Sequence, residues 1–458
     1  KEEDQLKLFL RFSKANFGIY YEKNSFHFIC KKHDNGSISF KTISNIPMYG
    51  QTAEEVGIIK REQLKPTSNL KTIMECIINY LLHCKTKDLD FSILAEQLMH
   101  LIICKLFDER YTHPHDFVSF YAEIAEESTV VKQRITYLFK QVKLNYHDIL
   151  APTDLILLDA ESLRYVVGKL QNFSIMECLP KTIDETFELL YNMSGNMPSQ
   201  KKIEISKNLI NTIVELINPQ LNETVLDPFC KEGELLRASL QHLHEKVDHY
   251  SQKCGWSDVF IQDKKLMIEC TEIFGIERNP IIAKVAKAKM IINQNGREKI
   301  YCDHILNSRN HWKFDTIQEV NFGKFDIVIS IASFLPNEET NDEALLQQYE
   351  LGYVWRKKGE VYIKTKKLKK KEKLQILFIE QCLKLVKKHG KMGLILPEVI
   401  FYTPQYNYLW YYILQNNNLQ YTLNLGKFNI SQRNRNQYGA IIIEKNSVQG
   451  ETQNHFIK

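Results

Sequence analysis

The sequence predicts an α/β protein in which a mainly helical N-terminal part precedes a mostly parallel, doubly wound sheet. Three observations predict this fold class. Apolar residues recur at three- and four-residue steps through much of the first half, short apolar runs alternate with helical patterns in the second half, and a stretch rich in Gly, Pro and Ser at 192–199 separates them. We therefore expect a small β-containing region at 1–65, a helical domain at 66–195 and an α/β domain at 196–458.

The N-terminal half carries two different periodicities. Residues 17–43 alternate apolar and polar side chains around Asp34-Asn35-Gly36, which is typical of a β-hairpin turn. Beyond them the apolar residues follow helical spacing, and helices are predicted from residue 70, at 130–144 and at 160–171, the last capped by Asp159.

The C-terminal half alternates strands with helices. Each predicted strand is a short apolar run followed by a helical pattern, as in sheets built with crossover helices. Strands are predicted at 224–226, 273–276, 299–302, 326–331 and 392–396, with helices that begin at Glu234 and Pro280. Two late strands, at 421–425 and 440–443, lie close enough in sequence to form an antiparallel edge.

Acidic residues end three successive strands of this sheet. They are Asp227, Glu277 and Asp303. Because the carboxyl ends of parallel strands meet at one edge, where doubly wound folds bind their ligands, the three side chains are expected to line one pocket. A turn and a helix N-terminus at Phe229 and Gly233 complete this pocket. Taken singly, each acid could instead be a helix cap or a solvated turn residue.

These motifs resemble those of N6-adenine DNA methyltransferases of the type I restriction-modification M-subunit kind. Asp227-Pro228-Phe229-Cys230 is similar to the start of the Asp-Pro-x-Cys-Gly-Ser-Gly signature, Gly275-Ile276-Glu277 to the ribose-binding motif, and Cys302-Asp303 to the adenine-contacting motif. The resemblance covers roughly residues 70–445. It implies a Rossmann-like class I S-adenosylmethionine-dependent methyltransferase fold, with Asp227, Phe229, Gly233, Glu277 and Asp303 as cofactor-binding residues.

The sequence departs from that family at the positions its chemistry needs. Ile331, Ala332, Ser333 and Phe334 occupy the place of the family's Asn-Pro-Pro-Phe motif. There the Asn oxygen and a Pro carbonyl accept hydrogen bonds from the target amine, while the aromatic ring stacks on the flipped base. Isoleucine has no acceptor, and Phe334 could equally be a core aromatic. The resemblance therefore implies a degenerate catalytic motif.

The glycine-rich loop of the family is also altered. Lys231 and Glu232 replace its Gly and Ser, which leaves only Gly233. Glycine in such a loop lets the backbone approach the ligand closely, whereas a long side chain hinders that approach. Binding of S-adenosylmethionine, the cofactor that the resemblance implies, is therefore in question.

A lysine-rich segment follows the catalytic positions. Between Arg356 and Lys373 the sequence has ten Lys or Arg and two Glu. In a loop that faces the substrate, these cations could neutralise the phosphates of double-stranded DNA, and the alternative is a solvated loop. The predicted DNA-binding residues are Lys357, Lys358, Lys369, Lys370 and Lys371.

Bulk properties argue against several classes of protein. The net charge of +5 does not by itself indicate a nucleic-acid binder. The ten cysteines include no CxxC pair, which argues against a zinc ribbon, and no metal site is predicted. No window approaches the roughly 20 apolar residues of a membrane span, and the opening Lys-Glu-Glu-Asp lacks the features of a secretory signal, so a cytoplasmic protein is expected.

Three functions are compatible with these observations. The first is a catalytically degenerate M-type subunit, a pseudoenzyme that binds double-stranded DNA within a restriction-modification or related defence complex. A specificity subunit or another subunit of the complex would then read the bases, since little chain follows Lys445. The second is an active adenine-specific DNA methyltransferase with a divergent motif. The third is an RNA-directed or protein-binding scaffold.

Overall fold

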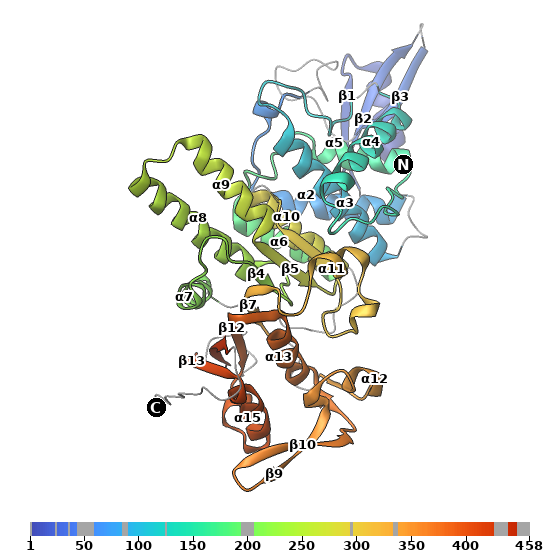
Figure 1. Ribbon diagram of the computed structural model, residues 1–458. Helices are drawn as coiled ribbons and strands as arrows, with labels where there is room; N and C mark the ends of the chain where they lie inside the picture. Colours follow the sequence, from blue (N-terminus) through green and yellow to red (C-terminus); the bar gives the residue numbers. More distant parts are fainter. Residues whose placement is uncertain are drawn as a thin grey trace. The chain divides into compact units, whose positions relative to one another are not determined.

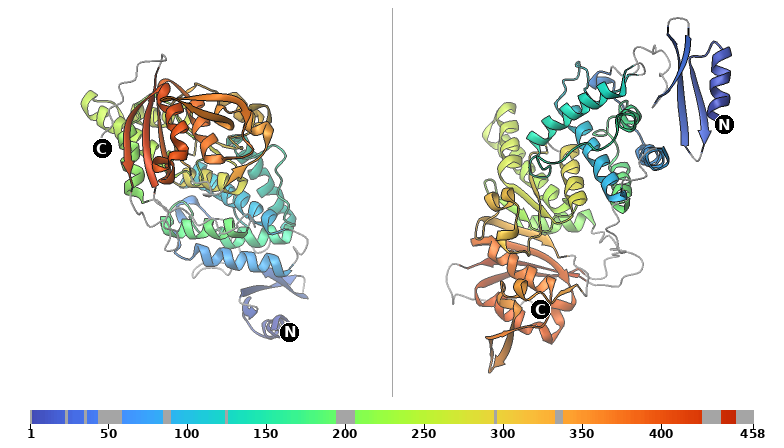
Figure 2. Two further views of the ribbon diagram at one scale, coloured as in Figure 1. Left: turned by 90° about the horizontal axis from the view of Figure 1, so that it is seen from below. Right: turned by 90° about the vertical axis from the view of Figure 1, so that its right-hand side faces the viewer.

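The computed structural model divides the chain into two compact units. It describes residues 2–22, 25–34, 37–43, 59–84, 90–123, 126–193, 206–293, 296–332, 338–425 and 438–446. One unit comprises residues 1–197 with 291–294, and the other comprises residues 198–290 with 295–458. Figures 1 and 2 show the helices and strands of both units.

The N-terminal unit begins with a helix and a small antiparallel sheet. Helix α1 (Glu2–Phe12) precedes strands β1 (Phe17–Glu22), β2 (Ser25–Asp34) and β3 (Ser37–Ile43), which pair in that order. Asp34 lies opposite Ser37, so the predicted hairpin is confirmed, although its turn residues lie outside the described part of the chain.

Helices make up the rest of this unit, as the periodicity predicts. They are α2 (Leu70–Cys84), α3 (Phe91–Tyr111), α4 (Ser128–Asn145), α5 (Ala160–Leu170) and α6 (Pro180–Met193). The carboxylate of Asp159 accepts the backbone N–H of Ser162 at 3.0 Å, which confirms the predicted cap of α5.

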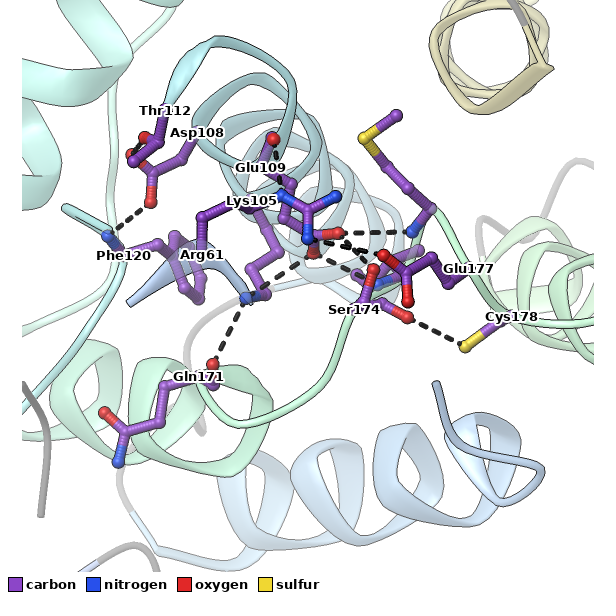
Figure 3. A network of polar contacts seen from close by, with 12 residues as sticks. Arg61, Lys105, Asp108, Glu109, Thr112, Phe120, Gln171, Ser174, Glu177 and Cys178 are labelled. Atoms are coloured by element: carbon purple, nitrogen blue, oxygen red, sulfur yellow. Dashed lines mark hydrogen bonds and ion pairs between the residues drawn. The ribbon is translucent and has the colours of Figure 1, made fainter. Parts of the chain in front are cut away.

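A buried polar network links α3 to the segment after α5 (Figure 3). The ammonium of Lys105 lies 3.4 Å from the Glu109 carboxylate, and both side chains are fully buried. Lys105 also donates to the Gln171 carbonyl oxygen at 3.2 Å, and Glu109 accepts the Ser174 hydroxyl at 2.8 Å and the Ile175 N–H at 3.0 Å. Burial lowers the pKa of Lys105. The two charges therefore depend on each other for compensation.

The C-terminal unit confirms the predicted doubly wound sheet. Among the described residues seven strands form one sheet in the order β13-β14-β12-β7-β4-β5-β6. The strands are β4 (Val225–Asp227), β5 (Ile273–Glu277), β6 (Lys299–Cys302), β7 (Phe325–Ile331), β12 (Val386–Pro397), β13 (Asn417–Asn424) and β14 (Tyr438–Lys445). Neighbours from β6 to β12 are parallel, and β14 runs antiparallel to both β12 and β13, as expected for the edge.

Helices connect the strands and cover the sheet (Figure 1). They are α7 (Lys207–Ile217), α8 (Glu234–Cys254), α9 (Asp258–Thr271), α10 (Pro280–Asn293), α11 (Phe314–Glu319), α13 (Leu374–Leu385) and α15 (Asn407–Gln415). Helix α8 contacts β4 and β5, whereas α13 contacts β7 and β12. Leu226, Val328 and Leu394 of the sheet share one buried cluster with Leu377 and Phe378 of α13. This core fixes the strand ends, where the candidate site lies.

The lysine-rich segment is a β-hairpin and not the loop that the sequence predicted. Strands β9 (Tyr353–Lys358) and β10 (Val361–Leu368) pair antiparallel, with Lys358 opposite Val361. Gly359 supplies the positive φ of +64° in the turn between them. Trp355 packs on Tyr412 and Tyr362 on Tyr411, both of α15. This aromatic support outweighs the low β propensity of lysine.

Candidate functional site

The three strand-end acids meet at one edge of the sheet. Asp227 ends β4 and Glu277 ends β5, and Asp303 follows directly after β6. The parallel register sets Glu277 opposite Cys302, and the Asp303 N–H donates to the Glu277 carbonyl oxygen at 3.1 Å. The structure thus brings these predicted residues together at the carboxyl edge.

Asp227 is the most deeply buried of these acids. Its Oδ1 accepts the Ser330 hydroxyl at 2.6 Å and the Phe229 N–H at 3.0 Å. Burial raises its pKa to about 7, although the hydrogen bond from Ser330 opposes that rise. Ser330 lies near the end of β7, one residue before the family's catalytic Asn position. The sequence did not predict this contact. Its only indication there was that Ser330 directly precedes the predicted catalytic position.

Asp227 should make the stability of the protein fall as the pH rises. The carboxyl has a pKa of 3.8 in the unfolded chain and about 7 in the folded protein, so the folded state holds the proton more tightly. The contribution of Asp227 to the free energy of unfolding is therefore complete below about pH 4 and is lost as the pH rises through 7. This contribution is at most about 4 kcal/mol. Asp227→Asn should reduce this loss, measured by urea unfolding from pH 4.5 to 8. If the free energy of unfolding changed with pH equally in the variant and the wild type, the assignment to Asp227 would be contradicted.

The loop after β4 is held in a conformation that suits glycine at two positions. Gly233 has φ +80° and caps α8, and a Cβ there would lie 2.9 Å from the Met290 Cε. Lys231 has φ +50°, a region that is costly for a residue with a Cβ. Its N–H donates to Glu277 Oε2 at 3.1 Å. The backbone therefore retains the path of a glycine loop although a lysine occupies it.

The side chain of Lys231 points into the same group of residues. Its Nζ lies 6.0 Å from the centre of the Phe229 ring. Burial lowers the pKa of this ammonium, and the carboxylates of Glu277 and Asp227 act against that change. Burial also raises the pKa of Glu277, which Lys231 opposes. An internal cation thus lies beside the acid that would hold a ribose.

The carboxylates of Glu277 and Asp303 accept further hydrogen bonds from backbone N–H groups of the chain. The second oxygen of Glu277 accepts the Asn279 N–H at 2.8 Å. The oxygens of Asp303 accept the backbone N–H groups of His304 at 2.8 Å and Lys313 at 2.7 Å. Asp303 therefore acts as a turn acceptor in this structure, which is the alternative that its sequence position also allows.

The residues present do not fit S-adenosylmethionine as they are arranged. The cofactor carries a positive sulfonium, and the Lys231 ammonium, 6.0 Å from the centre of the Phe229 ring, already places a positive charge within electrostatic reach of Glu277. A second cation in this partly enclosed place would be repelled by the first. The long side chain also occupies space that the glycine of the family leaves open.

The position that the resemblance assigns to the catalytic motif continues the sheet. Ile331 ends β7, and the N–H of Ala332 donates to the Ile395 carbonyl oxygen of β12 at 3.0 Å. The family has proline at the position of Ala332, and proline has no N–H to donate. Ser333 and Phe334 lie outside the described residues. The described half of the motif thus has a different backbone hydrogen bond as well as different side chains.

The predicted DNA-binding lysines fall into two groups. Lys357, Lys358 and Lys370 are exposed. Lys369 forms an ion pair with Glu372 and donates to the Tyr408 hydroxyl at 2.9 Å. Lys371 pairs with Glu339 at 2.7 Å but remains 67% exposed.

Comparisons with known proteins agree with this architecture. Residues 205–427 match the family model described as N-6 DNA Methylase. The chain is similar in structure to a modification subunit assigned to a type I restriction enzyme of Vibrio vulnificus, with a TM-score of 0.55, 13% identity, and coverage of 85% of this chain and 83% of that one. It also matches a protein of Listeria monocytogenes described as a class I S-adenosylmethionine-dependent methyltransferase, with a TM-score of 0.42, 14% identity, and coverage of 80% of this chain and 92% of that one.

The likeness to the Vibrio protein shows that the two chains share a fold. No curated protein sequence matches the chain. Within the described residues no helix is long and apolar enough to cross a membrane. The same residues contain no cluster of three or more His, Cys, Asp or Glu side chains that could hold a metal ion.

Proposed function

Because residues 205–427 match the family model of N-6 DNA methylases, we propose that the protein is a DNA-binding, M-type subunit of a restriction-modification or related defence complex that has lost methyl transfer. The observation that carries this proposal is Lys231, which replaces a glycine of the family in the loop bonded to Glu277 and whose ammonium lies 6.0 Å from the centre of the Phe229 ring. The change at Ile331 supports it independently.

The two changes affect separate parts of the reaction. Lys231 opposes cofactor binding through its charge and its length. Ile331 leaves the target amine without the positioned hydrogen-bond acceptor that it needs. Loss of one such polar group typically costs a factor of about a hundred or more in rate. Each change alone would slow the reaction, and together they leave neither substrate correctly held.

Two kinds of partner follow from the proposal. Double-stranded DNA is the ligand of the family, and the exposed cations of β9 and β10 would bind its phosphates. A specificity subunit, or another subunit of the complex, would supply base recognition. The M-subunit-like fold of the chain supports such an assembly.

Tritium transfer from S-adenosylmethionine to DNA tests the loss of activity. We expect no methylated adenine above background, whether the chain is assayed alone or with a co-expressed specificity subunit. Calorimetry should give no measurable heat of binding with S-adenosylmethionine. Robust adenine methylation in either assay would overturn the proposal.

A second candidate is an active methyltransferase with a divergent motif. The observation that favours it is the retained placement of Asp227, Glu277 and Asp303 at one edge. It requires the Lys231 side chain to swing out when the cofactor binds. Binding of S-adenosylmethionine by the unaltered chain would favour this candidate.

A further inference from the structure

The hairpin of β9 and β10 has two faces with different roles. The inner face carries Trp355 and Tyr362, which pack on α15. Because side chains alternate along a strand and cross-strand partners share a face, the opposite face carries two pairs. These are Arg356 opposite Ile363 and Lys358 opposite Val361. All four side chains are exposed, with Ile363 at 47% and Val361 at 42%.

The cations of the segment differ in whether they form ion pairs. Lys364 pairs with Glu350 at 3.1 Å, Lys369 pairs with Glu372, and Lys371 pairs with Glu339. Six other cations are exposed and form no ion pair with an acidic residue of the described chain. They are Arg356, Lys357, Lys358, Lys366, Lys367 and Lys370. Positive charge without internal compensation is thus concentrated on and beside the hairpin.

The hairpin arises at the edge of the sheet where the candidate site lies. It is part of the insertion between the end of β7 and the start of α13. Arg278, the residue after Glu277, forms an ion pair with Glu338 at 3.2 Å and so ties the base of this insertion to the strand end. Figures 1 and 2 show β9 and β10 as an arm that extends away from the sheet beside α15.

We propose that the outer face of this hairpin is a two-stranded ribbon that binds double-stranded DNA, independently of base sequence. The inference rests on the proposed function and specifies its DNA contact. The major groove of B-form DNA is about 12 Å wide and admits a two-stranded β-ribbon, whereas the major groove of A-form RNA is deep and narrow. The cations contact the DNA phosphates, and Val361 and Ile363 lie between these cations on the outer face of the ribbon.

The binding should depend steeply on salt. Each phosphate contact releases counterions and contributes about 0.9 to the slope of log affinity against log salt. The test uses the full chain and a fluorescent 30-base-pair duplex of random sequence, about three helical turns long, at several salt concentrations. The hairpin variant is Arg356→Gln/Lys358→Gln/Lys366→Gln. We expect its slope to fall by about 0.9 for each phosphate that is no longer neutralised and its affinity to fall roughly tenfold or more.

A matched control separates the hairpin from net charge. Lys181, Lys253 and Lys388 are exposed and lie outside the hairpin, on α6, at the end of α8 and in β12. Their triple Gln variant loses the same three charges, so its slope and affinity should stay near those of the wild type. The thermal midpoint of both variants should equal that of the wild type, because every changed side chain is exposed.

The outcomes distinguish this inference from the proposed function. If the wild type binds the duplex and both variants lose affinity equally, or neither does, the hairpin is not the contact, although the protein still binds DNA. If the wild type binds no duplex even at low salt, both the inference and the DNA-binding role are overturned. A structured RNA of equal length that binds more tightly through the same residues would overturn the assignment to DNA.

Discussion

Lys231→Gly is expected to restore cofactor binding to the edge formed by Asp227 and Glu277. The change removes an ammonium and four methylene groups from this place, while the φ of +50° suits glycine without strain. Juxtaposed like charges cost several kcal/mol, so the affinity for S-adenosylmethionine should rise about a hundredfold or more. Calorimetry on the full chain measures this gain.

One further variant separates charge from size, and a second serves as a control. Lys231→Met keeps the length of the side chain and removes its charge. If repulsion dominates, this variant should gain affinity for S-adenosylmethionine but much less for S-adenosylhomocysteine, whose sulfur is neutral. Glu232→Ser introduces the family residue at the next position, where the Glu232 carboxylate pairs with Lys289 at 2.5 Å, and should change neither affinity greatly. Failure of Lys231→Gly to bind either ligand would show that other features close the pocket.

Activity should not return with cofactor binding alone. Ile331→Asn added to Lys231→Gly supplies the missing acceptor, but the Ala332 N–H still holds the strand to Ile395. A proline at 332 breaks this hydrogen bond and leaves a buried carbonyl without that donor, at a cost of about 1–3 kcal/mol. The family motif therefore cannot be restored by side chains without a local change in the strand.

The strands and the acids were predictable because they depend on local patterns. Buried parallel strands read as apolar runs, and their ends fall where the runs stop, which places Asp227, Glu277 and Asp303 at one edge. The resemblance also indicated that Lys231 and Ile331 interrupt the site. These predictions need only the sequence and the parallel topology.

Two features were not predictable because they depend on contacts distant in sequence. The hairpin requires Trp355 and Tyr362 to pack on α15, which lies about fifty residues later in the chain. Its alternation is also hidden by lysines on both faces, since a charged residue does not mark the buried face. The bond from Ser330 to Asp227 likewise joins strands that are 103 residues apart.

The largest loss of stability is expected from breaking the buried pair in α3. Lys105→Met leaves the buried Glu109 carboxylate without the ammonium that it pairs with. Glu109→Leu leaves the Lys105 ammonium with the Gln171 carbonyl oxygen as its remaining partner in the network of Figure 3. Removal of one partner of a buried ion pair typically costs about 3–5 kcal/mol. Urea unfolding of the N-terminal unit measures the free energy of unfolding of each variant.

The double variant shows whether the pair itself stabilises the fold. Lys105→Met/Glu109→Leu buries no charge, so it should lose clearly less than the sum of the two single changes. Lys181 and Glu185 provide the control, because they have the same spacing and order on α6 but are exposed, at 87% and 43%. The same substitutions there should change stability by less than about 1 kcal/mol. Additive losses in α3 would mean that each charge is compensated by its other hydrogen bonds, with Glu109 held by Ser174 and Ile175 independently of Lys105.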